Sequence, residues 1–300
     1  MSTVTRSRGM QFACETSSHT RLMPEALALG AAVVFGLVHF FSGLLARRAD
    51  SWAVALYGQI GGVVVVAAAA VFWPAPQLTL ESIAWGALSG VGTGVGVAFL
   101  YRGLSTGRMS VVVPVSDVGA VALPVLVGVA LLGDRPTALA WVGVAAALPA
   151  LWLVSRSRQA ESSHAETGTL DGLIAGAGFA LQFIAISRID LEGGLWPILA
   201  ARILAAVTIV PLGLRSGARL RLPRRFVLPA CVVGAAGSVA IVLYFLATQE
   251  QLLALATVLA ALYPAIPVLL AMLFLHERLS RPQVVGLMLT AAAIGLISLG

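Results

Sequence analysis

Hydrophobic residues in this chain form long runs that short polar segments interrupt at regular intervals. Most runs are near the roughly 20 residues that an α-helix needs to cross a hydrocarbon core of about 30 Å. Lipid offers no partner to backbone N–H and C=O groups, so spanning segments of this kind are helical. We therefore predict ten transmembrane helices, at 26–46, 52–73, 83–104, 111–132, 139–154, 170–186, 195–214, 226–248, 252–275 and 284–299.

Two polar segments divide the chain. Residues 1–23 lack an apolar stretch followed by a cleavage site, so we interpret them as a disordered N-terminal tail and not as a secretory signal. Residues 156–169 have the polar composition of a flexible linker. The segments between and after, 24–155 and 170–300, are then two units of five predicted helices each.

The two units are copies of one another, because the first aligns with the second at one constant shift and without a gap. The matched residues include Pro124 with Pro267, Asp134 with Glu277, Arg135 with Arg278 and Gly143 with Gly286. Five helices per copy is an odd number, so the second copy enters the membrane from the opposite side. The predicted fold class is an all-α polytopic membrane protein built from two inverted five-helix repeats.

Composition supports a membrane protein and argues against other classes. The chain is 59% hydrophobic and 11% charged, whereas soluble domains are about 25% charged. Its net charge of +6 comes from arginines in loops and tails, which we interpret as topology signals and not as a nucleic-acid surface. Two cysteines at Cys14 and Cys231 suit neither a disulfide framework nor a metal site, so no metal or organic cofactor is expected.

Catalytic motifs are missing from the sequence. It has no phosphate-binding loop of the GxxxxGK[ST] type, no HExxH and no GxSxG, so we expect neither ATP hydrolysis nor another enzymatic activity. Uphill transport would then draw on an ion or solute gradient.

Ionisable side chains are rare within the predicted helices and costly there, so the three exceptions are candidates for substrate binding or ion coupling. These are Asp117, Arg202 and His39. Asp117 is the leading candidate for a protonatable or substrate-binding carboxylate, the alternative being that Arg202, His39 or hydroxyl groups neutralise it structurally. Arg202 could hold an anionic substrate or clamp its helix to a neighbour, and His39 could couple to protons or bond between helices.

Other residues at membrane depth are polar or small. Tyr101, Tyr244 and Tyr263 could line a solute cavity. Gly86, Gly90 and Gly94 repeat every four residues, which creates a helix face where another helix or a substrate approaches the backbone closely. Tight helix packing is the simpler interpretation of that face.

The repeat pattern, the proline-bearing segments VVVPVSDVGAVALPVL and LYPAIPVLLAMLFLHERLS, and the glycine-containing last helix of each half resemble the EamA-like permeases of the drug/metabolite transporter superfamily. Within PVLLAMLFLHERLSRPQVVG, Glu277 and Gly286 stand where that family carries an acid and a glycine, and ARILAAVTIVPL with Arg202 resembles its seventh helix. The resemblance implies a multi-pass protein of the cytoplasmic membrane with a cavity between the repeats.

The hypothesis favoured by these observations is a secondary-active transporter that moves a small metabolite or drug-like solute by alternating access. Proton coupling through Asp117 is part of that hypothesis. An intramembrane enzyme or a lipid-handling protein without ion coupling is the alternative. Orientation stays open: the resemblance implies cytoplasmic termini, whereas the arginine distribution favours cytoplasmic loops after the odd-numbered helices.

Overall fold

The computed structural model describes residues 30–127, 137–155, 163–186, 188–249 and 265–299. These residues form α-helices, one short 3-10 helix and no strand. The predicted all-helical class therefore holds for the described part of the chain. The predicted tail, the start of the predicted ninth helix and Tyr263 lie outside it.

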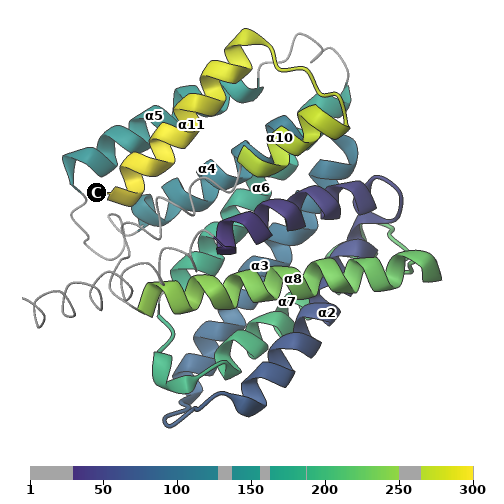
Figure 1. Ribbon diagram of the computed structural model, residues 1–300, viewed down its shortest axis with the longest axis vertical. Coiled ribbons are helices and arrows are strands. Elements are labelled where there is room, and N and C mark those ends of the chain that lie inside the picture. The colour runs from purple at the N-terminus through teal and green to yellow at the C-terminus, as the bar shows by residue number, and fades with distance from the viewer. Residues whose placement is uncertain (1–29, 128–136, 156–162, 187, 250–264, 300) are drawn as a thin grey trace, which may run out of the picture.

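The helices follow the predicted order (Figure 1). A first helix, Gly30–Ala46, is followed by α2 (Ser51–Phe72), α3 (Leu80–Thr106), α4 (Met109–Val127), α5 (Ala138–Ser155), α6 (Ser163–Ile186), η2 (Leu191–Gly193), α7 (Trp196–Arg215), α8 (Arg224–Gln249), α10 (Ala265–Phe274) and α11 (Arg281–Leu299). Helix α6 begins inside the segment predicted as a linker, at Ser163.

Five described helices are long and apolar enough to cross a membrane by length and composition. They comprise α2, α3, α7 and the segments Gly168–Ile186 and Arg224–Leu243. Shorter apolar helices occur at Gly30–Ala46, Met109–Ala120, Ala138–Ala150 and Arg281–Leu296. A multi-pass membrane protein follows from these lengths, while the exact number of ten crossings stays a prediction.

The internal duplication is visible in how the helices pack. At the shift that aligns the repeats, α2 corresponds to α7, α3 to α8 and α5 to α11. Helix α2 packs against α8, its counterpart α7 packs against α3, and α5 and α11 lie side by side (Figure 1). The contacts of α2 with α8 and of α7 with α3 are therefore a matched pair, while α3 and α4 also pack on α6 of the second repeat.

Small residues allow the two repeats to approach at backbone distance. A Cβ atom on Gly90 would collide with the carbonyl oxygen of Ala201 in α7, and one on Gly94 would lie 2.8 Å from the carbonyl oxygen of Ala205. A Cβ atom on Gly86 would likewise collide with the carbonyl oxygen of Pro197. The predicted glycine face of α3 is thus the surface on which α7 packs.

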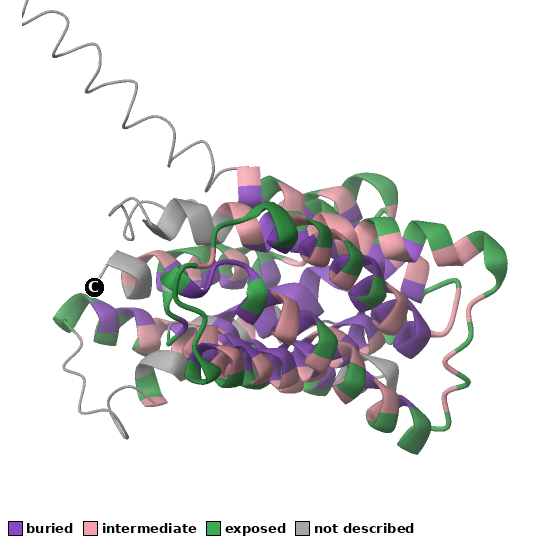
Figure 2. Ribbon diagram, turned by 90° about the horizontal axis from the view of Figure 1, so that it is seen from below, coloured by how far each residue is buried: buried purple, intermediate pink, exposed green. Residues whose placement is uncertain are grey.

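The outer surface has the character expected of a lipid-facing protein. Exposed positions run along the outer faces of the helices, with buried ones between them (Figure 2). Large apolar side chains such as Val64, Leu148 and Leu228 are exposed. The exposed tryptophans stand near helix ends, where amphipathic rings suit the headgroup region. They are Trp73, Trp141, Trp152 and Trp196.

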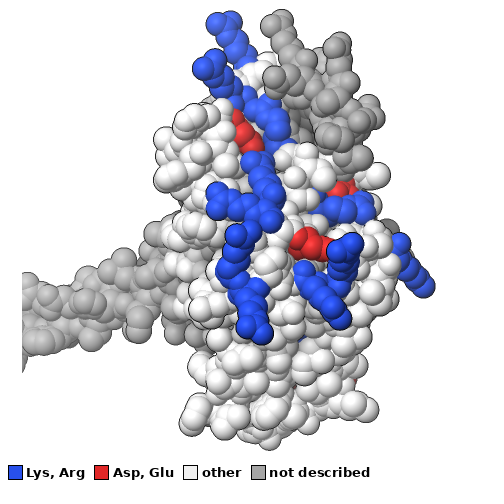
Figure 3. Space-filling view, turned by 90° about the vertical axis from the view of Figure 1, so that its right-hand side faces the viewer, with Lys and Arg blue, Asp and Glu red and all other residues white. Residues whose placement is uncertain are grey.

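Arginines gather on one face of the molecule, where loops join the first helix to α2, α3 to α4, α7 to α8 and α10 to α11 (Figure 3). We call this the arginine face. Its members are Arg47, Arg48, Arg102, Arg108, Arg215, Arg219, Arg221, Arg224, Arg225, Arg278 and Arg281. Of the other described arginines, Arg188 lies at the opposite end and Arg202 in the interior.

Candidate functional site

Buried polar side chains from both repeats meet between α2, α3, α7, α8 and the first helix. Ser42 of the first helix donates a hydrogen bond to the Tyr101 hydroxyl of α3 at 2.7 Å. Tyr101 is near enough to Arg202 of α7 for an electrostatic interaction. Gly62 of α2 lies against both the Arg202 side chain and the Ser238 hydroxyl of α8. We call Ser42, Gln59, Tyr101, Arg202 and Ser238 the inner polar cluster.

The centre of this cluster is a contact between Gln59 and Arg202. Arg202 donates from Nη1 to Gln59 Oε1 at 3.2 Å, and the two residues are 143 positions apart, which is the shift that aligns the repeats. They are thus the same position in the two copies. Matched residues meet only near the axis that relates their repeats, and in inverted repeats that axis lies in the plane of the membrane.

Arg202 is buried and incompletely satisfied. Only 6% of its surface is exposed, and among the described residues its Nη2 atom has no hydrogen-bond partner. Neither salt bridge of the described residues involves it. A guanidinium stays charged at any accessible pH, so this position holds a positive charge that one neutral amide oxygen only partly stabilises.

Asp117 lies elsewhere in the packing. It is fully buried in α4, whose Ser116 donates to the Val113 carbonyl at 2.8 Å and faces Gly176 of α6. The structure joins Arg202 to Gln59, and neither salt bridge of the described residues pairs Arg202 with Asp117. One polar anchor of α6 is Gln182, the repeat counterpart of His39. The Gln182 Oε1 atom accepts from the Thr93 hydroxyl of α3 at 2.8 Å.

Of the remaining candidate residues, the structure describes the side chain of His39 but not those of Tyr244 and Tyr263. His39 is buried in the first helix, one turn before Ser42. Tyr244 is the repeat counterpart of Tyr101 and belongs to α8, but its side chain lies outside the described part of the structure, as does Tyr263. The structure therefore brings Tyr101 and Arg202 together, and the roles of His39, Tyr244 and Tyr263 stay predictions.

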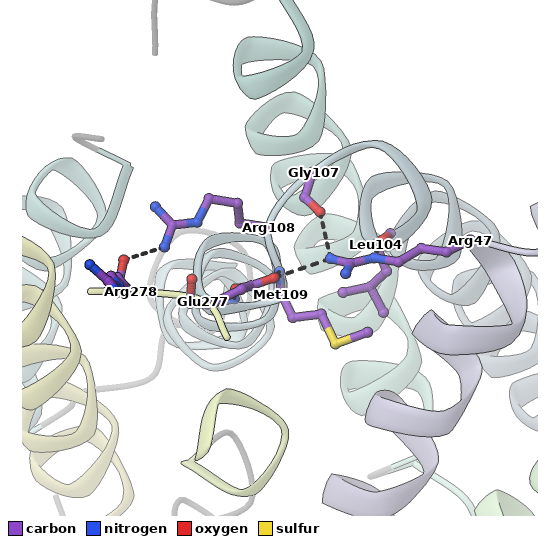
Figure 4. A network of polar contacts seen from close by, with 8 residues as sticks. Arg47, Leu104, Gly107, Arg108, Met109, Glu277 and Arg278 are labelled. Atoms are coloured by element: carbon purple, nitrogen blue, oxygen red, sulfur yellow. Dashed lines mark hydrogen bonds and ion pairs between the residues drawn. The ribbon is translucent and has the colours of Figure 1, made fainter. Parts of the chain in front are cut away.

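A second polar network lies at the arginine face and joins the repeats there (Figure 4). Glu277, from the loop between α10 and α11, accepts from the backbone N–H of Met109 at 3.2 Å and of Ser110 at 3.1 Å. It also forms a salt bridge of 3.1 Å with Arg47. One carboxylate thus caps the amino end of α4 and binds the carboxyl end of the first helix.

Neighbouring contacts extend this network. Arg47 also donates to the carbonyl oxygens of Leu104 and Gly107, both at 3.1 Å, and Arg108 donates to the carbonyl oxygen of Arg278. Arg47 and Arg108, both from the first repeat, therefore hold backbone groups at this face.

Two further carboxylates bridge the repeats at the same face. Asp171 of α6 accepts from Arg102 of α3 at 2.9 Å, while the Arg102 guanidinium lies 4.7 Å from the ring centre of Phe99. Asp50, which caps α2, accepts from the backbone N–H of Arg219 at 3.2 Å. Glu277, Asp171 and Asp50 thus each join the two repeats at this face.

Sequence reasoning missed both central partnerships. It anticipated neither the contact of Glu277 with the amino end of α4 nor the contact of Gln59 with Arg202. The constant shift between the repeats matches Gln59 with Arg202 and so held the signal for the second contact. Among the described residues, no group of three or more His, Cys, Asp or Glu side chains could hold a metal ion.

Comparisons with known proteins agree with this architecture. The EamA-like transporter family model matches residues 22–156 and again residues 167–299, one match for each repeat. A solved structure described as "Crystal structure of protein" is 19% identical, covers 91% of this chain and 96% of its own, and has a TM-score of 0.55, which supports the fold alone. A search of curated proteins returned no match. The two matches confirm the resemblance seen in the sequence, and the chain belongs to the EamA-like transporter family.

Proposed function

We propose that this protein is a secondary transporter that carries a small solute across the cytoplasmic membrane by alternating access between its two repeats. The observation that supports this most directly is the contact of Gln59 with Arg202, which sets a buried charge at the repeat axis. A charge inside the membrane costs several kcal/mol unless it is compensated, and in membrane proteins such residues mark substrate or ion paths.

The contacts at the arginine face suggest which gate is closed in this conformation. Glu277, Asp171 and Asp50 each join one repeat to the other there. A path from the inner polar cluster to that face would require the repeats to separate, which would break these contacts. We therefore assign the structure to a state closed at the arginine face.

The distribution of arginines supports a proposal for the orientation of the protein. Short loops rich in arginine remain in the cytoplasm, and the described interhelical arginines lie on the arginine face apart from Arg188. We propose that the arginine face is cytoplasmic, which sets Gly30 and the end of α11 on the external side.

Proton coupling is assigned to Asp117, with His39 as the second candidate. Asp117 is a fully buried carboxylate on α4, the helix whose amino end Glu277 caps. Protonation would remove a charge from the interior, and movement of α4 during gating would change its surroundings. This links the coupling group to the helix that the gate holds.

Transport by the purified protein tests the proposal. Reconstituted vesicles would be loaded with labelled amino acids, carboxylic acids, nucleosides, sugars or cationic amines, and efflux followed with and without a pH gradient. We expect saturable flux of at least one solute that exceeds flux from protein-free vesicles. Absence of flux for every solute class, from protein that melts cooperatively, would count against a transporter of small solutes.

A further inference from the structure

We infer that Arg202 binds the carboxylate group of the transported solute, which would make this protein a carrier of small monocarboxylic acids. The inference rests on the transport function proposed above and adds the class of solute. Its basis is a hydrogen-bond donor in the inner polar cluster, Arg202 Nη2, that has no acceptor among the described residues.

The Arg202 guanidinium has binding capacity to spare. Nη1 donates to Gln59, whose amide oxygen carries no net charge, and Nη2 is buried without a hydrogen-bond partner among the described residues. A buried donor without an acceptor costs about 1–3 kcal/mol, and more when the group is charged. A bound anion would supply both the missing acceptor and the missing negative charge.

The geometry of the cluster favours a carboxylate. A guanidinium presents its N–H groups in a planar fork that matches two carboxylate oxygens. Ser42 donates to the Tyr101 oxygen, so the phenolic proton of Tyr101 is left for another acceptor. Tyr101 lies within electrostatic range of Arg202 and is a further candidate donor to an anion bound there.

The single positive charge of Arg202 favours a ligand that carries one negative charge. Among the described arginines, Arg202 is the one in the interior, since the others lie at the arginine face or at the opposite end. A single positive charge balances one carboxylate. A doubly charged phosphate would bring one uncompensated negative charge into the membrane, which is costly.

The repeats themselves argue that the charge has a purpose beyond packing. The matched position in the first repeat is Gln59, a shorter and neutral residue. Neutral side chains hold other buried helices of this chain together, as Thr93 of α3 does with Gln182 of α6. A clamp alone therefore does not require arginine at position 202, whereas an anion site does.

The test compares acids with their uncharged amides. Full-length protein in detergent would be melted with acetate, lactate and benzoate, and with the primary amide of each. We expect at least one acid to raise the melting temperature in a saturable way while its amide does not. Arg202→Gln should weaken that acid at least about tenfold, and Arg202→Lys, which keeps charge without the fork, should lie between. Arg221→Gln, an exposed change at the arginine face, should leave the affinity unchanged.

Three results would overturn the inference: no acid stabilises the protein, acid and amide stabilise it equally, or Arg202→Gln binds the acid as well as the unaltered protein. If Arg202→Gln does not fold, the comparison of acid with amide and the Arg202→Lys variant decide. A nucleoside, sugar or amine that crosses vesicles while no acid binds would leave transport standing and remove the carboxylate site. If an acid binds in a way that depends on Arg202 but no solute crosses the vesicles, the carboxylate site would stand and the transport function would not.

Discussion

Arg47 and Glu277 belong to different repeats, and their side chains meet at 3.1 Å at the arginine face. Exposed ion pairs contribute little, with a median of about 0–1 kcal/mol. Here the carboxylate side chain is only 9% exposed and also caps α4. The contact therefore joins three helix ends, and its removal has consequences for both stability and gating.

Replacement of Glu277 by alanine should destabilise the protein by about 1–2 kcal/mol, because α4 loses its cap and Arg47 its partner. Thermal unfolding in detergent measures this as a lower melting temperature. Glu192→Ala, an exposed acid at the opposite end, serves as the matched control and should change little. Equal melting temperatures for the two variants would mean that the contact contributes nothing.

The same substitution should favour a state open at the arginine face. Ser110 is 2% exposed beneath Glu277, so a Ser110→Cys reporter in a chain lacking Cys14 and Cys231 should react slowly with a water-soluble maleimide. Adding Glu277→Ala should raise the reaction rate about fivefold, which corresponds to about 1 kcal/mol in the gating equilibrium. An unchanged rate would indicate that this carboxylate does not hold the gate.

Cysteine labelling in intact cells tests the orientation. A cysteine at Arg221, exposed on the arginine face, should be protected from a membrane-impermeant maleimide, and one at Gln77, exposed at the opposite end, should react. The physical reason is retention of short arginine-rich loops in the cytoplasm. The reverse pattern would show that the protein inserts against its arginine distribution.

Asp117→Asn should abolish the response of transport to a pH gradient, because asparagine keeps the size of the side chain but cannot exchange a proton. The measurement is flux of a transported solute in vesicles with and without that gradient. Asp190→Asn, an exposed change, should retain the response. If Asp117→Asn still responds fully, the coupling group is another residue, and His39 would be examined next.

Close packing between the repeats predicts a contrast between two glycines. Gly90→Ala should destabilise by about 1–3 kcal/mol, since its Cβ would collide with the Ala201 carbonyl. Gly295→Ala in α11 meets no atom within 4 Å and should be neutral or stabilising by up to about 1 kcal/mol. Melting temperatures of the two variants decide the point. Similar effects at both sites would contradict the packing described.

Much of the fold follows from local sequence. The length of each apolar run predicts a helix wherever lipid leaves the backbone no other partner, and the described helices occupy the predicted segments. The duplication likewise predicts which helices correspond. The glycines of α3 indicated a packing surface, although not that α7 would be the helix upon it.

The sequence by itself determined the helical class, the two repeats and the rarity of charges in the membrane, because each depends on residue type and spacing along the chain. Only the tertiary structure decided that Arg202 meets Gln59 and that Glu277 caps α4. These contacts join residues more than a hundred positions apart, so they depend on how the two repeats pack. The shared hydrophobicity of the helices does not specify that packing.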